Sequence, residues 1–137
     1  MNAEDIIIKT SLKYYPDLQA VYLFGTYGTD EEWPDSDVDI ALLLPWKKSK
    51  EAGSLMMSDL RFELESLLNK DVDLINLREV STVLQKEVIV AGRRIYCADE
   101  YATDEFEMLV LSYYQKLSEE RRDILQSFFE TRRAFNV

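Results

Sequence analysis

Apolar residues recur along this chain with two periods, and each period predicts a different kind of element. Apolar side chains three or four positions apart are typical of a helix that covers a core. This spacing predicts a first helix over residues 3–15 and a second over residues 51–68. In the second helix, the apolar stripe consists of Met56, Leu60, Leu64 and Leu67.

The same helical spacing continues in the second half of the chain. It predicts a helix over residues 81–91, where Ser81 suits the N-cap position and Gly92 ends the helix. A last helix is predicted over residues 104–133, which is long for a chain of 137 residues.

Short runs rich in β-branched, aromatic and leucine residues predict strands between these helices. The runs cover residues 20–24, 37–44 and 72–76, and residues 94–97 are predicted as an edge strand. Helices and strands of these lengths predict a small α/β (α+β) domain in which a mixed β-sheet is flanked by helices.

The last helix is too long for the body of such a domain. About 30 helical residues extend about 45 Å, whereas the radius of gyration of a domain of this size is about 14 Å. We therefore predict one domain over residues 1–137, with a core over 1–98 and a C-terminal helix over 99–137 that docks a partner. The first half of that helix is expected to cover the sheet. For its end, with Phe128 and Phe129, partner contact and ordinary packing both remain open.

Composition restricts the chemistry that this chain can perform. It contains no histidine and one cysteine, Cys97, which excludes a Ser-His-Asp triad, a Cys-His pair and a disulfide within the chain. Catalysis or metal binding must then depend on carboxylates, and carboxylate oxygens favour hard ions such as Mg²⁺ or Mn²⁺.

Charge and hydropathy restrict the partners. The 26 acidic residues outnumber the 16 basic residues, and the net charge of −10 would repel a phosphate backbone. Direct nucleic-acid binding is therefore not expected. No apolar run approaches the roughly 20 residues that cross a bilayer, and the N-terminus does not resemble a signal peptide, so we expect a cytoplasmic protein without membrane contact.

Candidate chemistry begins where the first predicted strand ends at Gly25-Thr26. A glycine allows close approach to the backbone, and a helical turn beginning there would offer free N–H groups to a phosphate. Thr26 adds a hydroxyl donor. These two residues therefore form a candidate phosphate-binding loop.

Two aspartates follow on the next predicted strand. Asp37 and Asp39 lie two positions apart, so both side chains point to one face, where their mutual repulsion favours a divalent cation. Asp73, on another short strand, offers a third carboxylate, although Asp71 would face the same side and competes for this role. The alternative is that Asp37 and Asp39 are ordinary turn and strand residues.

This arrangement resembles a known family. Gly25-Thr26, ten further residues and then Asp37-Val38-Asp39 resemble the G-S-(ten)-D-x-D signature of DNA polymerase β-like nucleotidyltransferases. Within that superfamily, the chain looks like the minimal nucleotidyltransferase (MNT) antitoxins that accompany HEPN-domain ribonuclease toxins. The resemblance extends over nearly the whole chain and includes residues 72–78 and 92–96.

The resemblance implies a nucleotidyltransferase fold and the transfer of AMP from ATP to a hydroxyl of the HEPN partner, with tyrosine as the expected acceptor. Asp37 and Asp39 would hold one or two Mg²⁺ ions. Asp73 would complete the metal site and help to deprotonate the hydroxyl, and Gly25 and Thr26 would position the β- and γ-phosphates.

Two departures from the family pattern leave other functions open. Thr26 replaces the usual serine, and Thr29 stands where related sequences often carry a basic residue. A catalytically weak antitoxin that acts by steric binding is therefore one alternative. Small-molecule nucleotidyl transfer is another, which we disfavour because the chain contains no second domain for a small substrate.

Overall fold

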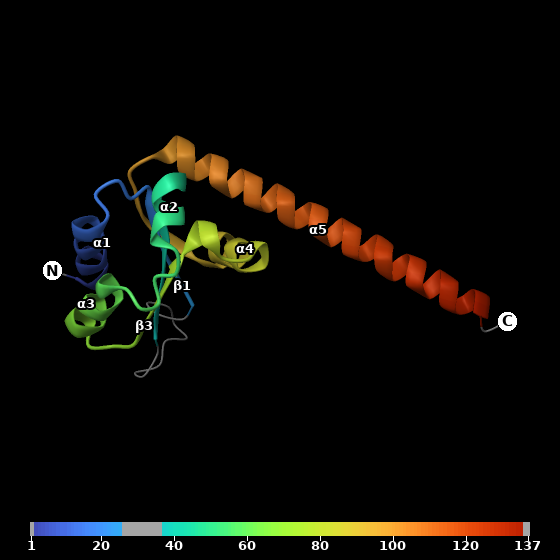
Figure 1. Cartoon of the computed structure of the whole chain (residues 1–137), viewed down its shortest axis with the longest axis horizontal. Helices are drawn as coiled ribbons and strands as arrows, with labels where there is room; N and C mark the ends of the chain where they lie inside the picture. Colours follow the sequence, from blue (N-terminus) through green and yellow to red (C-terminus); the bar gives the residue numbers. More distant parts are fainter. Residues whose placement is uncertain (1, 26–36, 136–137) are drawn as a thin grey trace.

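The computed structural model describes residues 2–25 and 37–135, with side chains as far as residue 131. A compact body of strands and short helices carries one long projecting helix (Figure 1). In chain order the elements are α1 (Ala3–Tyr14), β1 (Ala20–Phe24), β2 (Val38–Leu43), α2 (Trp46–Ala52), α3 (Asp59–Leu68), β3 (Val72–Asn76), the short 3₁₀ helix η1 (Leu77–Glu79), α4 (Thr82–Ala91), β4 (Arg93–Cys97) and α5 (Glu100–Phe135).

The four strands form one mixed sheet in the order β3-β2-β1-β4. β1 is antiparallel to both of its neighbours, whereas β2 and β3 are parallel. β4 lies at an edge, as its sequence predicted. The prediction of a small mixed sheet flanked by helices is therefore confirmed.

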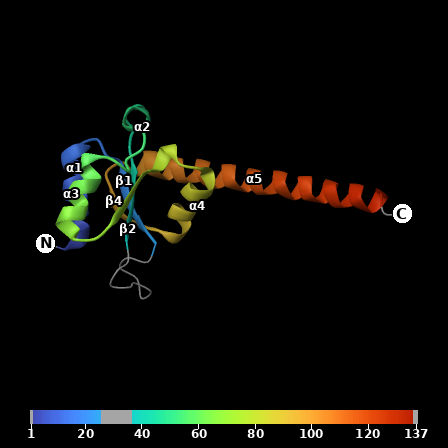
Figure 2. The same ribbon diagram turned by 60° about the horizontal axis from the view of Figure 1, so that its bottom comes forward.

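Helices cover both faces of the sheet (Figure 2). On one face, α1 and α3 enclose a core that includes Ile7, Leu23, Ile40 and Leu64. On the other face, α4 and the first part of α5 pack over a second core that includes Tyr22, Leu43, Val88, Phe106 and Val110. Neighbouring strand residues point to opposite faces, so β1 and β2 contribute side chains to both cores.

The prediction of one helix over residues 51–68 is wrong. The structure has two helices there, α2 and α3, because Gly53 takes a left-handed conformation with φ 59° and ends α2. Ser58 then caps α3 by accepting a hydrogen bond from the Arg61 backbone N–H. Leu60 and Leu64 are buried as predicted, whereas Met56 and Leu67, the other members of the stripe, are exposed.

The helix ends predicted from capping residues are confirmed elsewhere. The Ser81 side chain accepts a hydrogen bond from the backbone N–H of Leu84, and Gly92 follows the last residue of α4. Asn69 ends α3 in a left-handed conformation with φ 53°. The Ser81 hydroxyl thereby satisfies a backbone N–H that the helix leaves unpaired.

Ion pairs and a hydrogen bond hold the first turns of α5 against the sheet, and the remainder of the helix projects from it. Arg94 on β4 forms ion pairs with Asp104 and Glu107, and the Tyr22 hydroxyl donates a hydrogen bond to Glu107 over 2.8 Å. Every residue from 115 to 131 is exposed. The helix has 36 residues, or about 54 Å, so the expected projection is confirmed. In the described part of the chain, no helix is both long and apolar enough to cross a membrane.

Candidate active site

The parallel pairing of β2 and β3 places two of the predicted aspartates opposite each other. Asp39 is the second residue of β2, Asp73 is the second residue of β3, and the two are register partners. Strand alternation directs both side chains to the face that α4 and α5 cover, which they share with Ala41 and Ile75. Each aspartate is partly exposed.

The third predicted ligand, Asp37, directly precedes β2 and is exposed. Its charge nevertheless acts on Asp39, as the electrostatics of the site show. The competing residue Asp71 is also exposed and lies one position before β3, where its carbonyl oxygen accepts a hydrogen bond from the Val38 N–H at 2.9 Å. Asp73 faces Asp39 in register and Asp71 does not, so the geometry favours Asp73.

Gly25 at the end of β1 packs against the carboxylate of Asp39. Its φ of 77° is a conformation that side chains other than glycine rarely adopt, and a Cβ built on it would lie 2.1 Å from Oδ2 of Asp39. The structure therefore requires glycine here, at the position that the sequence assigned to phosphate binding. Thr26, Thr29 and the helical turn expected after Gly25 fall within residues 26–36, outside the described residues.

The electrostatics of this site disfavour the charged form of Asp39. Burial raises the pKa of Asp39, the charges of Asp73 and Asp37 act in the same direction, and together they bring it to about 6. None of these influences comes from a cation in the described residues. A positive ion bound here would stabilise the charged form of Asp39, because its attraction would offset the repulsion between the carboxylates.

The donor set fits a hard divalent cation that the substrate helps to bind. All candidate ligand atoms are carboxylate oxygens, the donors that Mg²⁺ prefers. Within residues 2–25 and 37–135, no three acidic or cysteine side chains are arranged to hold a metal ion alone. Mg²⁺ is usually held by one or two carboxylates with water and substrate phosphates, and the facing pair Asp39 and Asp73 has the number of carboxylates that such a site uses.

Two further structural features support the site, although the sequence did not connect them with it. Arg61 on α3 donates from Nε to the Val72 carbonyl at 2.8 Å, and Glu65 accepts from the Val72 N–H at 3.2 Å, which holds the start of β3 in place. Gly92 was predicted only as a helix end. A Cβ there would lie 3.0 Å from the carbonyl oxygen of Leu23, so glycine also lets α4 approach the end of β1.

Comparisons with known proteins agree with this geometry. The family described as "Polymerase beta, Nucleotidyltransferase" matches residues 7–101. The chain is 36% identical over 123 residues to the "Protein adenylyltransferase MntA" of Shewanella oneidensis, covering 89% of this chain and 84% of that protein.

Solved structures give the same result. One is the MNT antitoxin in complex with the tri-AMPylated HEPN toxin of Shewanella oneidensis, with a TM-score of 0.70, 34% identity and coverage of 93% of this chain and 96% of the other. A second is a toxin–antitoxin complex with AMP-PNP, with a TM-score of 0.71, 35% identity and coverage of 92% and 98%.

The chain belongs to the polymerase β nucleotidyltransferase family. The resemblance to MNT proteins that the signature residues indicated is therefore confirmed, together with the nucleotidyltransferase fold and the enzyme class. Nucleotide use follows from this family membership and agrees with the AMP-PNP bound in the second complex.

Proposed function

We propose that this protein is an adenylyltransferase antitoxin that transfers AMP from ATP to a hydroxyl of a partner HEPN ribonuclease, with tyrosine as the acceptor, and thereby neutralises it. The observation that carries the proposal is the facing pair Asp39 and Asp73 beside Gly25. The similarity to a protein adenylyltransferase over 89% of the chain supports the choice of a protein substrate. We place the reaction in the cytoplasm, where ATP and Mg²⁺ are abundant.

In this proposal, ATP binds at the end of β1 with its triphosphate against Gly25 and Thr26. Asp37, Asp39 and Asp73 would hold one or two Mg²⁺ ions, which would neutralise phosphate charge and orient the α-phosphate. The glycine matters because its missing side chain leaves room for the Asp39 carboxylate and for close backbone approach.

The transfer itself is a displacement at the α-phosphorus. The acceptor hydroxyl oxygen forms a bond to the α-phosphorus while the bond from that phosphorus to the oxygen bridging the α- and β-phosphates breaks, and pyrophosphate leaves. The hydroxyl proton passes to a carboxylate oxygen of Asp73. Asp37 and Asp39 contribute by holding charge and position, so most of the rate enhancement comes from alignment and electrostatic stabilisation.

Mass spectrometry of the partner tests this function. The chain and a HEPN protein from the same organism are co-expressed, and the intact mass of the purified HEPN protein is measured. We expect the mass increase of one or more AMP groups with the wild-type chain and none with Asp37→Asn or Asp39→Asn. Tandem mass spectrometry then locates the modified residue. An unmodified partner in the wild-type sample would exclude AMP transfer.

Neutralisation by steric binding is the second candidate, and the exposed half of α5 supports it because that helix offers a large surface beyond the catalytic body. Thr26 and Thr29, which depart from the family pattern, also favour it. A growth assay separates the two candidates. If Asp39→Asn still protects cells from the ribonuclease, binding alone is sufficient for neutralisation.

A further inference from the structure

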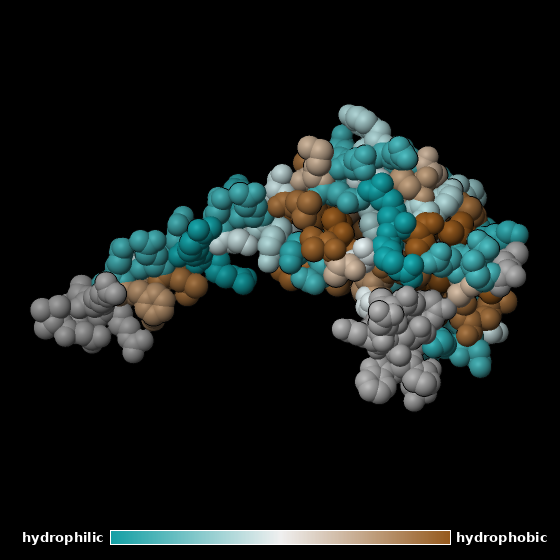
Figure 3. All heavy atoms as spheres, turned by 180° about the vertical axis from the view of Figure 1, so that it is seen from behind, coloured by the Kyte–Doolittle hydropathy of each residue, from teal (hydrophilic) through white to brown (hydrophobic). Residues whose placement is uncertain are grey.

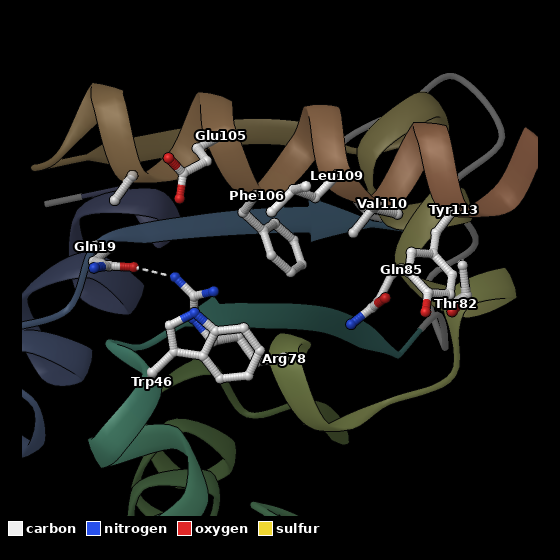
Figure 4. A pocket seen from close by; sticks show the side chains of 11 residues that line it. Gln19, Trp46, Arg78, Thr82, Gln85, Glu105, Phe106, Leu109, Val110 and Tyr113 are labelled. Atoms are coloured by element: carbon white, nitrogen blue, oxygen red, sulfur yellow. Dashed lines mark hydrogen bonds between the residues drawn. The ribbon is translucent and has the colours of Figure 1, made fainter.

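A second surface feature lies at the opposite end of the strands from the aspartates. It is a groove of about 380 Å³ between the start of α5, α4 and the residues that follow β2 and β3 (Figure 4). Its principal lining side chains are Trp46, Arg78, Glu105, Phe106, Leu109 and Tyr113. The groove is on the same sheet face as Asp39 but about 16 Å away, as five strand residues at about 3.3 Å each imply.

Arg78 lies half-buried in the groove with part of its donor capacity unused. Its Nε donates to the Leu44 carbonyl and its Nη2 donates to Oε1 of Gln19 at 2.7 Å. No acceptor in the described residues bonds to Nη1. Burial lowers the pKa of Arg78, and the charge of Glu105 on the groove rim raises it. Arginine keeps its charge in proteins, so Nη1 of the guanidinium offers two N–H groups to an incoming anion.

Aromatic and aliphatic side chains enclose this charge. The guanidinium carbon of Arg78 lies 4.9 Å from the centre of the Trp46 ring and 5.2 Å from that of Phe106. Figure 4 shows Arg78 beside Trp46, beneath the helix that carries Phe106 and Leu109. An apolar side chain entering here would meet ring faces and a methyl-lined helix, and a carboxylate beside it would reach Nη1.

The groove lies open at the surface, and much of its apolar lining is exposed. Trp46, Leu109 and Tyr113 are 61%, 58% and 63% exposed although they line it. Seen from behind, the body also exposes apolar side chains close to the point where the long helix leaves it (Figure 3). Exposed apolar side chains gathered at one place are typical of sites of protein association.

We propose that the groove docks a segment of the acceptor protein that presents one carboxylate beside a bulky apolar side chain. The carboxylate pairs with Nη1 of Arg78, and the apolar side chain packs between Trp46 and Leu109. This inference rests on the proposed protein-directed AMP transfer. Docking at the far end of the sheet leaves Asp39 and Asp73 free and raises the local concentration of the acceptor hydroxyl at the reaction site.

Two neighbouring residues on α5 provide a matched test. Leu109 lines the groove, whereas Met108 does not line it and is 69% exposed, so Leu109→Ser and Met108→Ser remove similar apolar side chains from the same helix turn. We expect Leu109→Ser to raise the KM for the acceptor protein at least about tenfold, with little change in kcat or in the KM for ATP. Met108→Ser should leave all three constants unchanged.

A variant that removes a negative charge from the groove tests the proposed carboxylate of the acceptor segment. Glu105 is the acidic side chain of the groove lining and competes for Arg78, so Glu105→Gln should tighten acceptor binding about two- to fivefold. Glu119→Gln, which removes the same charge from an exposed position farther along α5, is its control. Equal effects of the two glutamine variants, or of the two serine variants, would overturn the proposal, and so would a loss of ATP affinity in Leu109→Ser.

Direct binding separates this inference from the proposed function. The Kd for the unmodified partner is measured by calorimetry for wild type, Leu109→Ser and Met108→Ser without ATP. If the wild type binds the partner but transfers no AMP, the proposed chemistry fails while the serine pair still tests the groove. If AMP is transferred and the serine pair binds equally, the groove is not the docking site.

Discussion

The charge of Asp39 should make the metal-free protein less stable than it would be with a neutral side chain there. Burial and the charges of Asp73 and Asp37 raise the pKa of Asp39 from its ordinary value of 3.8 to about 6. In Asp39→Asn the side chain keeps its shape and loses its charge. We therefore expect this variant to unfold at higher temperature than the wild type when no divalent ion is present.

The size of this stability difference follows from the change in the proton affinity of Asp39 on folding. A tenfold change in proton affinity is about 1.4 kcal/mol, so the shift corresponds to about 3 kcal/mol for a fully buried group. Asp39 is partly open to solvent, which screens the interactions, and we expect about 1–2 kcal/mol. For a protein of this length, 1 kcal/mol corresponds to a change in Tm of about 2–6 °C.

The pH dependence has a definite sign. Between about pH 4 and pH 6, the folded protein holds a proton on Asp39 that the unfolded chain has lost, so the wild type loses stability as pH rises through this window. The asparagine variant lacks this effect. The stability difference should therefore be small at about pH 4 and reach its full value above about pH 6.

Chemical denaturation in EDTA at several pH values measures this difference, and Asp71→Asn serves as the control because Asp71 is exposed and outside the strand. Saturating Mg²⁺ and ATP should reverse the order by stabilising only the wild type, by about 2.7 kcal/mol at a hundred times the Kd. The reasoning is refuted if Asp39→Asn destabilises the metal-free protein at neutral pH.

Three further outcomes are expected. Asp73→Asn should lower AMP transfer at least about 100-fold and Asp71→Asn less than about threefold, as measured by radiolabelled transfer; similar losses would contradict the assignment of Asp73. Gly25→Ala should cost about 1–2 kcal/mol in denaturation and abolish transfer, because its Cβ would collide with the Asp39 carboxylate; full activity would contradict the close packing. Truncation after Gln126 should leave Tm unchanged but weaken co-purification with the partner, since residues 127–131 are exposed; unchanged co-purification would show that the removed residues are dispensable.

Local patterns in the sequence were sufficient to predict most of the helices and strands. Residues 20–24 and 72–76 are strands as predicted, and Ser81 caps the start of α4 as predicted, because turn chemistry and capping depend on a few neighbouring residues. The candidate site residues were also chosen from sequence, since the order of strand, glycine and paired aspartates encodes a loop between two strands. Their roles remain predictions that the variants above test.

Only the tertiary structure decided which side chains meet. The register of β2 against β3 sets Asp73, and not Asp71, opposite Asp39, and register depends on packing between segments more than 30 residues apart in the chain. Helical periodicity likewise continued through Gly53 and concealed the break between α2 and α3. The groove around Arg78 brings together residues from α2, η1, α4, α5 and the segment before β1. No local sequence pattern predicts this, because burial and the direction of a side chain are fixed by the whole fold.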